Sequence, residues 1–195
     1  MSIKWLVFDL GGVLFDFDGV AGVAAIAGLS VEAAHNALIS STAIRDLETG
    51  AIEPRVFGLR FAAELGVPHT SDEMLSLWAS WEAGPKPGTI QLLKQLGGQS
   101  NLACLTNNNA IHWERLSNEY AAHTFFDRCF LSHEIGLHKP DPRIFEHLIS
   151  ELNVHPGEII YFDDRDDIVV AAKSSGLDAY QATSPQEIEE LLSSF

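Results

Sequence analysis

Cysteine is scarce in this sequence, since its 195 residues include two, Cys104 and Cys129. Both lie within short apolar stretches, where cysteine commonly packs as a small hydrophobic side chain, so we expect no disulfide framework. Long hydrophobic runs are also missing. The apolar stretch at residues 3–8 ends at Asp9, which makes it too short for a membrane span and unlike a signal peptide. We therefore expect a cytoplasmic protein that does not act at a membrane.

Basic residues are few, with 12 Lys and Arg against 27 Asp and Glu and a formal net charge of −15. Such a field repels polyanions and anionic membrane surfaces, which argues against nucleic-acid binding. A small anionic substrate stays compatible, because a metal ion and one or two cationic side chains dominate the potential inside a cleft. With 46% hydrophobic residues, the chain can bury one compact core and carry a smaller insertion.

Short apolar stretches that end in polar turns recur along the chain and are typical of buried strands. They lie at residues 3–8, 102–105, 128–131 and 159–162, with a weaker candidate at 179–182. Helical patterns separate them, at residues 89–96, 110–120, 142–152, 166–175 and 185–194. The last of these begins with a cap signal, Ser184-Pro185-Gln186-Glu187. Strands that alternate with helices predict an α/β fold with a doubly wound parallel sheet.

Residues 18–87 interrupt this alternation, because they show only helical periodicity, for example at residues 54–65 and 74–81. We predict a small all-helical cap inserted after the first strand. The core domain would then comprise residues 1–17 and 88–195, and the cap domain residues 18–87. A cap over the carboxyl edge of a sheet excludes water and selects substrates.

Polar side chains follow three of the predicted strands, as Asp9, Thr106 and the pair Asp163-Asp164. In open parallel sheets, ligands bind beyond the carboxyl ends of the strands, so we expect these residues to meet there. Two adjacent carboxylates at the end of an apolar strand repel each other without a cation. The pair therefore favours a metal site over a helix cap.

These segments resemble the haloacid dehalogenase superfamily of phosphatases and related hydrolases, over essentially the whole chain. Four motifs in the family's order and spacing carry the resemblance: Phe-Asp-Leu-Gly-Gly-Val-Leu at residues 8–14, Leu-Thr-Asn at 105–107, Gly-Leu-His-Lys-Pro-Asp-Pro at 136–142 and Tyr-Phe-Asp-Asp at 161–164. The resemblance implies a Rossmann-like core, and the family's small cap is found where the helical stretch lies.

The same resemblance implies a phosphatase in which Asp9 attacks phosphorus and forms an aspartyl-phosphate that water then hydrolyses. Lys139 would offset the negative charge of Asp9 and the phosphoryl group, and Thr106 would donate to phosphoryl oxygens. Further contacts to the substrate are expected from Asn107, Gly11 and Gly12. The implied partner is a small phosphorylated metabolite, for a protein that is a monomer or a homodimer.

Magnesium is the implied cofactor, and its implied ligands are Asp9, the Gly11 carbonyl, Asp163 and Asp164. Magnesium prefers hard oxygen ligands, which these groups supply. Whether Asp163 binds the ion directly or supports a ligand is left open by the sequence.

Two positions depart from the family pattern. Phosphatase members usually place a second Asp two residues after the nucleophile, where it acts as general acid and then as base. This chain has Gly11 at that position. A general acid–base group typically raises the reaction rate by about 10²- to 10⁴-fold. Either another group, such as Asp16 or Asp18, supplies the proton, or the leaving group needs little help. The first motif resembles that of bacterial α-D-glucose-1-phosphate phosphatases, which also have Gly there. Four residues after Asp164, relatives usually carry Asp or Asn, and this chain has Ile168.

Two other functions fit the same motifs. A 2-haloacid dehalogenase needs no general acid for the departing halide, which suits Gly11, but it needs no magnesium and so leaves the Asp163-Asp164 pair without a purpose. A non-catalytic binder of phosphorylated ligands would keep the fold without turnover. Binding alone does not require a nucleophile opposite Lys139, so we prefer the phosphatase.

Overall fold

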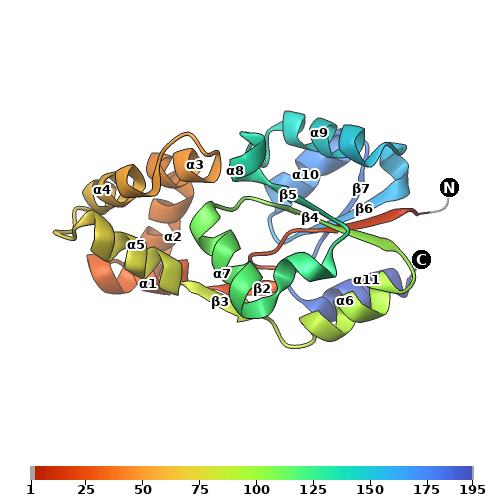
Figure 1. Ribbon diagram of the computed structural model, residues 1–195, viewed down its shortest axis with the longest axis horizontal. Coiled ribbons are helices and arrows are strands. Elements are labelled where there is room, and N and C mark those ends of the chain that lie inside the picture. Colours follow the sequence, from red (N-terminus) through yellow and green to blue (C-terminus); the bar gives the residue numbers. More distant parts are fainter. Residues whose placement is uncertain (1–2, 195) are drawn as a thin grey trace.

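Five apolar stretches form one parallel sheet in the computed structural model, which describes residues 3–194 (Figure 1). The strands lie in the order β5-β4-β1-β6-β7. Their bounds are Trp5–Phe8 (β1), Asn101–Thr106 (β4), Arg128–Leu131 (β5), Ile159–Asp163 (β6) and Asp178–Gln181 (β7). The central strand β1 pairs in parallel with β4 on one side and with β6 on the other. The predicted doubly wound sheet is confirmed.

Helices pack on both faces of this sheet, with α6 and α11 on one side and α9 and α10 on the other (Figure 1). The core helices are α6 (Thr89–Gly97), α7 (Ala110–Tyr120), α8 (Ser132–Ile135), α9 (Pro142–Leu152), α10 (Asp166–Ser174) and α11 (Pro185–Leu192), with short 3-10 turns at Ala122–Phe125 and Pro156–Glu158. The predicted N-cap of helix α11 is present, because the Glu187 backbone amide donates to Ser184 Oγ at 3.3 Å.

Side chains alternate between the two faces of the central strands, as the period of a strand requires. Phe8 and Phe162 pack into one hydrophobic cluster with α6, α7 and α11. Val7 and Tyr161 pack into the other cluster with α9 and α10. Each buried side chain of this size contributes about 1.5–3 kcal/mol, so both faces hold the strand ends in place.

Five helices form the predicted cap: α1 (Gly19–Ala27), α2 (Val31–Ser40), α3 (Thr42–Glu48), α4 (Pro54–Leu65) and α5 (Ser71–Ser80). They enclose a core of their own, which includes Phe57, Phe61, Met74, Trp78 and Trp81. Helix α5 begins with a capping box between Thr70 and Glu73. Among the described residues, no single helix is long and apolar enough to cross a membrane; α1 and α2 pass as a pair by length and composition, but they are bent by 109°.

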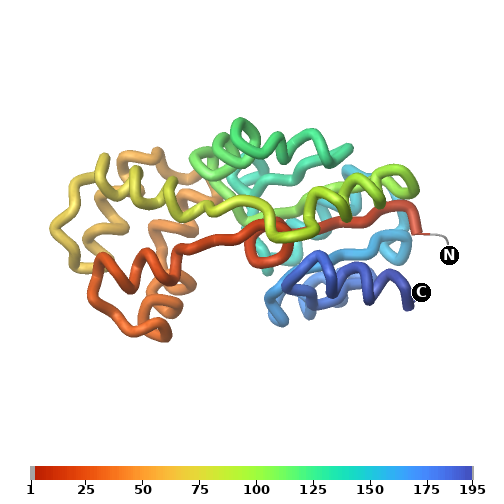
Figure 2. Tube along the Cα trace, turned by 90° about the horizontal axis from the view of Figure 1, so that it is seen from below, coloured from red at the N-terminus to blue at the C-terminus, as the bar shows by residue number. Residues whose placement is uncertain are grey.

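The connections between the lobes contain a second sheet that the sequence analysis missed. Strand β2 (Phe15–Phe17) pairs antiparallel with β3 (Glu82–Pro85), and Phe17 is the partner of Glu82. Figure 2 shows the two connections running side by side. The expectation of purely helical structure in residues 18–87 was therefore wrong at β3, because strands of three and four residues are too short to show a period of two. The domain boundaries at residues 17/18 and 87/88 stay a prediction.

Candidate active site

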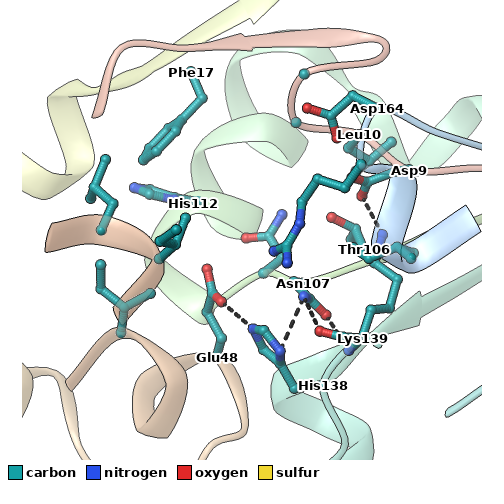
Figure 3. Close-up of a pocket in the computed structure, with 18 of the residues that line it drawn as sticks. Asp9, Leu10, Phe17, Glu48, Thr106, Asn107, His112, His138, Lys139 and Asp164 are labelled. Atoms are coloured by element: carbon teal, nitrogen blue, oxygen red, sulfur yellow. Dashed lines mark hydrogen bonds and ion pairs between the residues drawn. The ribbon is translucent and has the colours of Figure 1, made fainter. Parts of the chain in front are cut away.

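The carboxyl ends of three neighbouring strands open into one cavity of about 1040 Å³. Asp9 follows β1, Thr106 ends β4 and Asp164 follows β6, and all three line this cavity. The cap lines its other side, with residues that include Val20, Ile39, Ile44, Arg45 and Glu48. Figure 3 shows Asp9, Thr106, Lys139 and Asp164 at one end and Phe17 and His112 at the other. The sheet order explains this meeting, because β1 lies between β4 and β6.

Lys139 is the electrostatic centre of the site. Its side chain is fully buried, and its Nζ lies 3.0 Å from Asp9 Oδ1 and 2.7 Å from Asp163 Oδ2. It also donates to the Tyr161 hydroxyl at 2.9 Å. Burial alone would lower the pKa of Lys139, but the charges of Asp163 and Asp9 raise it above its ordinary value. The side chain therefore stays a cation between two carboxylates.

Tyr161 completes this network, and the sequence analysis missed it. Its hydroxyl donates to Asp163 Oδ2 at 2.5 Å. Tyr161 lies within an apolar strand, so the sequence pattern indicated a buried side chain and did not indicate a role for its hydroxyl. Residues two apart on a strand share a face, which is why Tyr161 and Asp163 meet.

The two adjacent carboxylates of the fourth motif have different surroundings. Asp163 is fully buried and accepts hydrogen bonds on both oxygens, from Lys139 and Tyr161 on Oδ2 and from the Arg165 amide on Oδ1. Asp164 is partly buried and lines the cavity, and its side chain lies against Gly12. Asp164 is thus free to meet a cation, while Asp163 anchors Lys139.

The residues present fit a hard divalent cation. One oxygen each of Asp9, Asp163 and Asp164 lies within 4.8 Å of the others, and Lys139 supplies a single positive charge among them. Burial raises the pKa of Asp9 well above its usual range; Lys139 opposes this, and the charges of Asp163 and Asp164 add to it. Burial and the charge of Asp163 likewise raise the pKa of Asp164. A bound cation would relieve this excess of negative charge.

Thr106 and Asn107 differ in what their side chains do. Thr106 is buried and lines the cavity, and Asn109 rather than Thr106 caps α7, because Asn109 Oδ1 accepts from the His112 amide at 3.2 Å. The Asn107 amide holds the third motif: its Oδ1 accepts from the Lys139 amide at 2.8 Å and its Nδ2 donates to the Lys139 carbonyl at 3.0 Å. Asn107 therefore positions Lys139, in addition to lining the cavity.

The loop after Asp9 is shaped by its glycines. Gly12 has φ +79° and no room for a side chain, because a Cβ there would overlap the Asp164 carboxylate. Gly11 has open space around it, with no atom within 4 Å of a Cβ placed there. Lys86, which directly follows β3 on the connection from the cap back to the core, donates from Nζ to the Gly12 carbonyl at 2.6 Å. This hydrogen bond holds that connection against the loop.

The two predicted stand-ins for the missing general acid are exposed. Asp16 lines the cavity, but 56% of its side chain is accessible and its ion-pair partner is Lys86 at 3.9 Å. Asp18 is exposed and is not among the lining residues. Ile168 is buried and lines the cavity, and the neighbouring Asp167 pairs with Arg165 at 2.7 Å rather than turning to the carboxylates.

Comparisons with known proteins agree with this arrangement. The sequence model of the haloacid dehalogenase-like hydrolases matches residues 3–176. A sesquiterpene phosphatase of Aspergillus oryzae is 26% identical, over 90% of this chain and 88% of its own. A D-ribitol-5-phosphate phosphatase of Bacteroides thetaiotaomicron is 27% identical, over 98% of this chain and 100% of its own.

The fold is shared with solved structures of the same kind. A haloacid dehalogenase family enzyme from Bacteroides thetaiotaomicron, in complex with magnesium and inorganic phosphate, superimposes with a TM-score of 0.76 at 24% identity, covering 92% of this chain and 94% of its own. The matched sequence model spans most of the chain, and the four motifs meet in one cavity. The chain therefore belongs to the haloacid dehalogenase-like hydrolases.

Proposed function

We propose that this hydrolase is a magnesium-dependent phosphatase that cleaves a small phosphate monoester through an aspartyl-phosphate on Asp9. The observation that carries the proposal is the buried Asp9 carboxylate, which lies 3.0 Å from Lys139 and beside two further carboxylates, at the bottom of a cavity large enough for a metabolite. A buried nucleophile opposite a buried lysine has a clear use in phosphoryl transfer.

The chain's own groups have separate tasks in this reaction. Asp9 supplies the attacking oxygen, and Lys139 offsets the charge on Asp9 and on the phosphoryl oxygens. Thr106 and the backbone amide of Gly11 donate hydrogen bonds where negative charge develops. The Gly12 amide already donates to the Phe15 carbonyl at 2.9 Å, so it shapes the loop and does not bind the substrate. Asn107 keeps Lys139 in place through two hydrogen bonds.

Magnesium would be held by Asp9, Asp164 and the Gly11 carbonyl, with Asp163 in support through Lys139, and it would offset charge on the phosphoryl group. The hydrogen bonds already made by both oxygens of Asp163 favour this division between Asp163 and Asp164. A cytoplasmic location and a monomeric or dimeric state stay predictions.

Phosphate release from a panel of esters tests the proposal, with magnesium and with a chelator. The panel contains polyol and sugar phosphates, acetyl phosphate and p-nitrophenyl phosphate, and 2-chloropropionate is assayed for halide release. We expect metal-dependent phosphate release. The matched control is Asp9→Asn, which keeps the shape of the side chain and should lose at least about 10³-fold in kcat. Halide release without metal would point to the dehalogenase, and full activity of Asp9→Asn would eliminate the aspartyl-phosphate.

A further inference from the structure

Glu82 is a buried carboxyl group with no role in the reaction steps described above. It is the first residue of β3, on the connection that returns from the cap. The residue is 5% exposed, lines the same cavity as Asp9, and its Oε1 has no hydrogen-bond partner among residues 3–194. An unpartnered buried polar atom is costly, and it often marks a site for a ligand.

Glu82 is not neutralised by the histidine beside it. His112 Nδ1 is 3.8 Å from Glu82 Oε2, too far for a hydrogen bond. The side-chain Nδ2 of Asn109 lies 3.3 Å from the same Nδ1 and can only donate, so Nδ1 of His112 accepts. Nε2 of His112 donates to the Trp78 carbonyl at 2.8 Å. Burial also lowers the pKa of His112. The imidazole is therefore neutral, and among residues 3–194 no ion pair holds Glu82 ionised.

The carboxyl group itself keeps its proton near neutral pH. Burial raises the pKa of Glu82 to about 8; the charge of Arg115 opposes the rise and that of Asp9 adds to it. The charged and titratable groups that act on it are His112 and Arg115 of α7 and Asp9 across the cavity. On the paired strand β2, Asp16 lies opposite Gly84, and the partner of Glu82 is the apolar Phe17. A general acid works best with a pKa near the working pH, and Glu82 meets this condition.

The direction of the reaction places the leaving group on the side of Glu82. In an in-line displacement, the attacking and leaving oxygens lie on opposite sides of phosphorus, so attack by Asp9 turns the leaving oxygen toward the cap. His112 lies at the end of the cavity opposite Asp9, and Glu82 adjoins His112 (Figure 3). Glu48 also lines the cavity, but its carboxylate already lies against His138 at 2.8 Å.

We propose that Glu82 is the general acid that protonates the leaving oxygen, in place of the carboxyl group that is missing at Gly11. This inference rests on the proposed phosphatase function. In the first step an Asp9 oxygen forms a bond to phosphorus, the ester P–O bond breaks, and the Glu82 proton passes to the leaving oxygen to give the alcohol. In the second step Glu82, now a carboxylate, takes a proton from the water that attacks phosphorus, which releases phosphate and restores both carboxyl groups.

The test compares Glu82→Gln with the unchanged protein on two esters with different leaving groups. A polyol phosphate has an alkoxide leaving group, which needs a proton. p-Nitrophenyl phosphate has a stable phenolate leaving group, which does not. The ratio kcat/KM reports only the first step, in which the ester bond breaks, so we expect Glu82→Gln to lose about 10²- to 10⁴-fold in kcat/KM on the polyol phosphate and less than about tenfold in kcat/KM on p-nitrophenyl phosphate. The second step is common to both esters, so kcat should fall on both. Asp16→Asn, the matched control for the rival donor, should show no such dependence on the leaving group.

A pH profile gives a second measurement. For the polyol phosphate, kcat/KM of the unchanged protein should fall above about pH 8, as Glu82 loses its proton, and this fall should be absent in Glu82→Gln. An equal loss in kcat/KM on both esters, a change confined to KM on the polyol phosphate, or a selective loss in Asp16→Asn instead would overturn the role of Glu82. If the unchanged protein hydrolyses neither ester with magnesium, the proposed phosphatase function itself has failed.

Discussion

The Glu48 carboxylate of the cap lies 2.8 Å from Nε2 of His138 in the core. The other ring nitrogen, Nδ1, lies 3.2 Å from Asn107 Nδ2, which can only donate. Nδ1 therefore accepts, and the Nε2–H group donates a hydrogen bond to the Glu48 carboxylate. Asn107 also holds Lys139, so a chain of contacts connects the cap helix α3 to Lys139. Gly50 packs against the His133 carbonyl with no room for a side chain, which brings α3 close to α8.

Breaking this contact should weaken cap closure. We expect Glu48→Ala and His138→Ala each to lower kcat/KM, and the double variant to lose less than the sum of the two. The coupling free energy in the double-mutant cycle should be about 0.5–3 kcal/mol, the range for contacting residues. Losses in kcat/KM that simply add would show that the two side chains act independently.

Asp163 and Asp164 form a matched pair for separating stability from metal binding. Asp163→Asn removes a charge that holds buried Lys139, and breaking a buried pair typically costs about 3–5 kcal/mol in free energy of unfolding. Asp164→Asn removes a carboxylate that is repelled by Asp163, so stability without metal should change by less than about 1 kcal/mol. Urea unfolding in chelator measures both.

Calorimetric titration with magnesium completes that comparison. Asp164→Asn should bind the ion at least about tenfold more weakly, because it loses a charged oxygen ligand. Unchanged affinity in Asp164→Asn, together with lost affinity in a folded Asp163→Asn, would exchange the roles of the two residues.

The adjacent glycines offer a second matched pair. Gly12→Ala should lose about 1–2 kcal/mol from its left-handed backbone alone and should also displace Asp164, so magnesium-dependent phosphate release should disappear. The methyl group of Gly11→Ala meets open space, so its free energy of unfolding should change by no more than on the order of 1 kcal/mol. Its thermal midpoint should then stay within a few degrees of that of the unchanged protein. Thermal unfolding and phosphate release are measured on both. Equal effects of the two substitutions would contradict the close contact seen at Gly12.

Glu82 should leave a signature in the pH dependence of stability. Its pKa is about 8 in the folded protein against an ordinary 4.5, so between these values the folded state keeps a proton that the unfolded state has lost. The free energy of unfolding therefore falls as pH rises through this window, and Glu82→Gln abolishes that fall. From pH 5 to pH 9, the stability of Glu82→Gln relative to the unchanged protein should rise by roughly 1–4 kcal/mol, measured by urea unfolding. A difference that is constant with pH would show that Glu82 is ionised in the folded protein.

Much of the fold was predictable because its signals are local. The apolar stretches that end at Asp9 and Thr106 predicted strands, and the cap signal at Ser184 predicted the start of α11. The strand ends also predicted that these residues and Asp164 meet, since parallel neighbours end at one edge.

The contacts between segments that are distant in the sequence were decided by the tertiary structure alone. Nothing around Glu82 in the chain distinguishes it from a surface glutamate; packing between β2, α5 and α7 buries it. Glu48 and His138 are 90 residues apart and meet because the cap closes on the core. Sequence by itself determined the strands, the motif residues and the edge where they gather, because these follow from local periodicity and caps. The environments that set protonation and cap closure depend on how two separately packed lobes come together, and only the folded chain shows that.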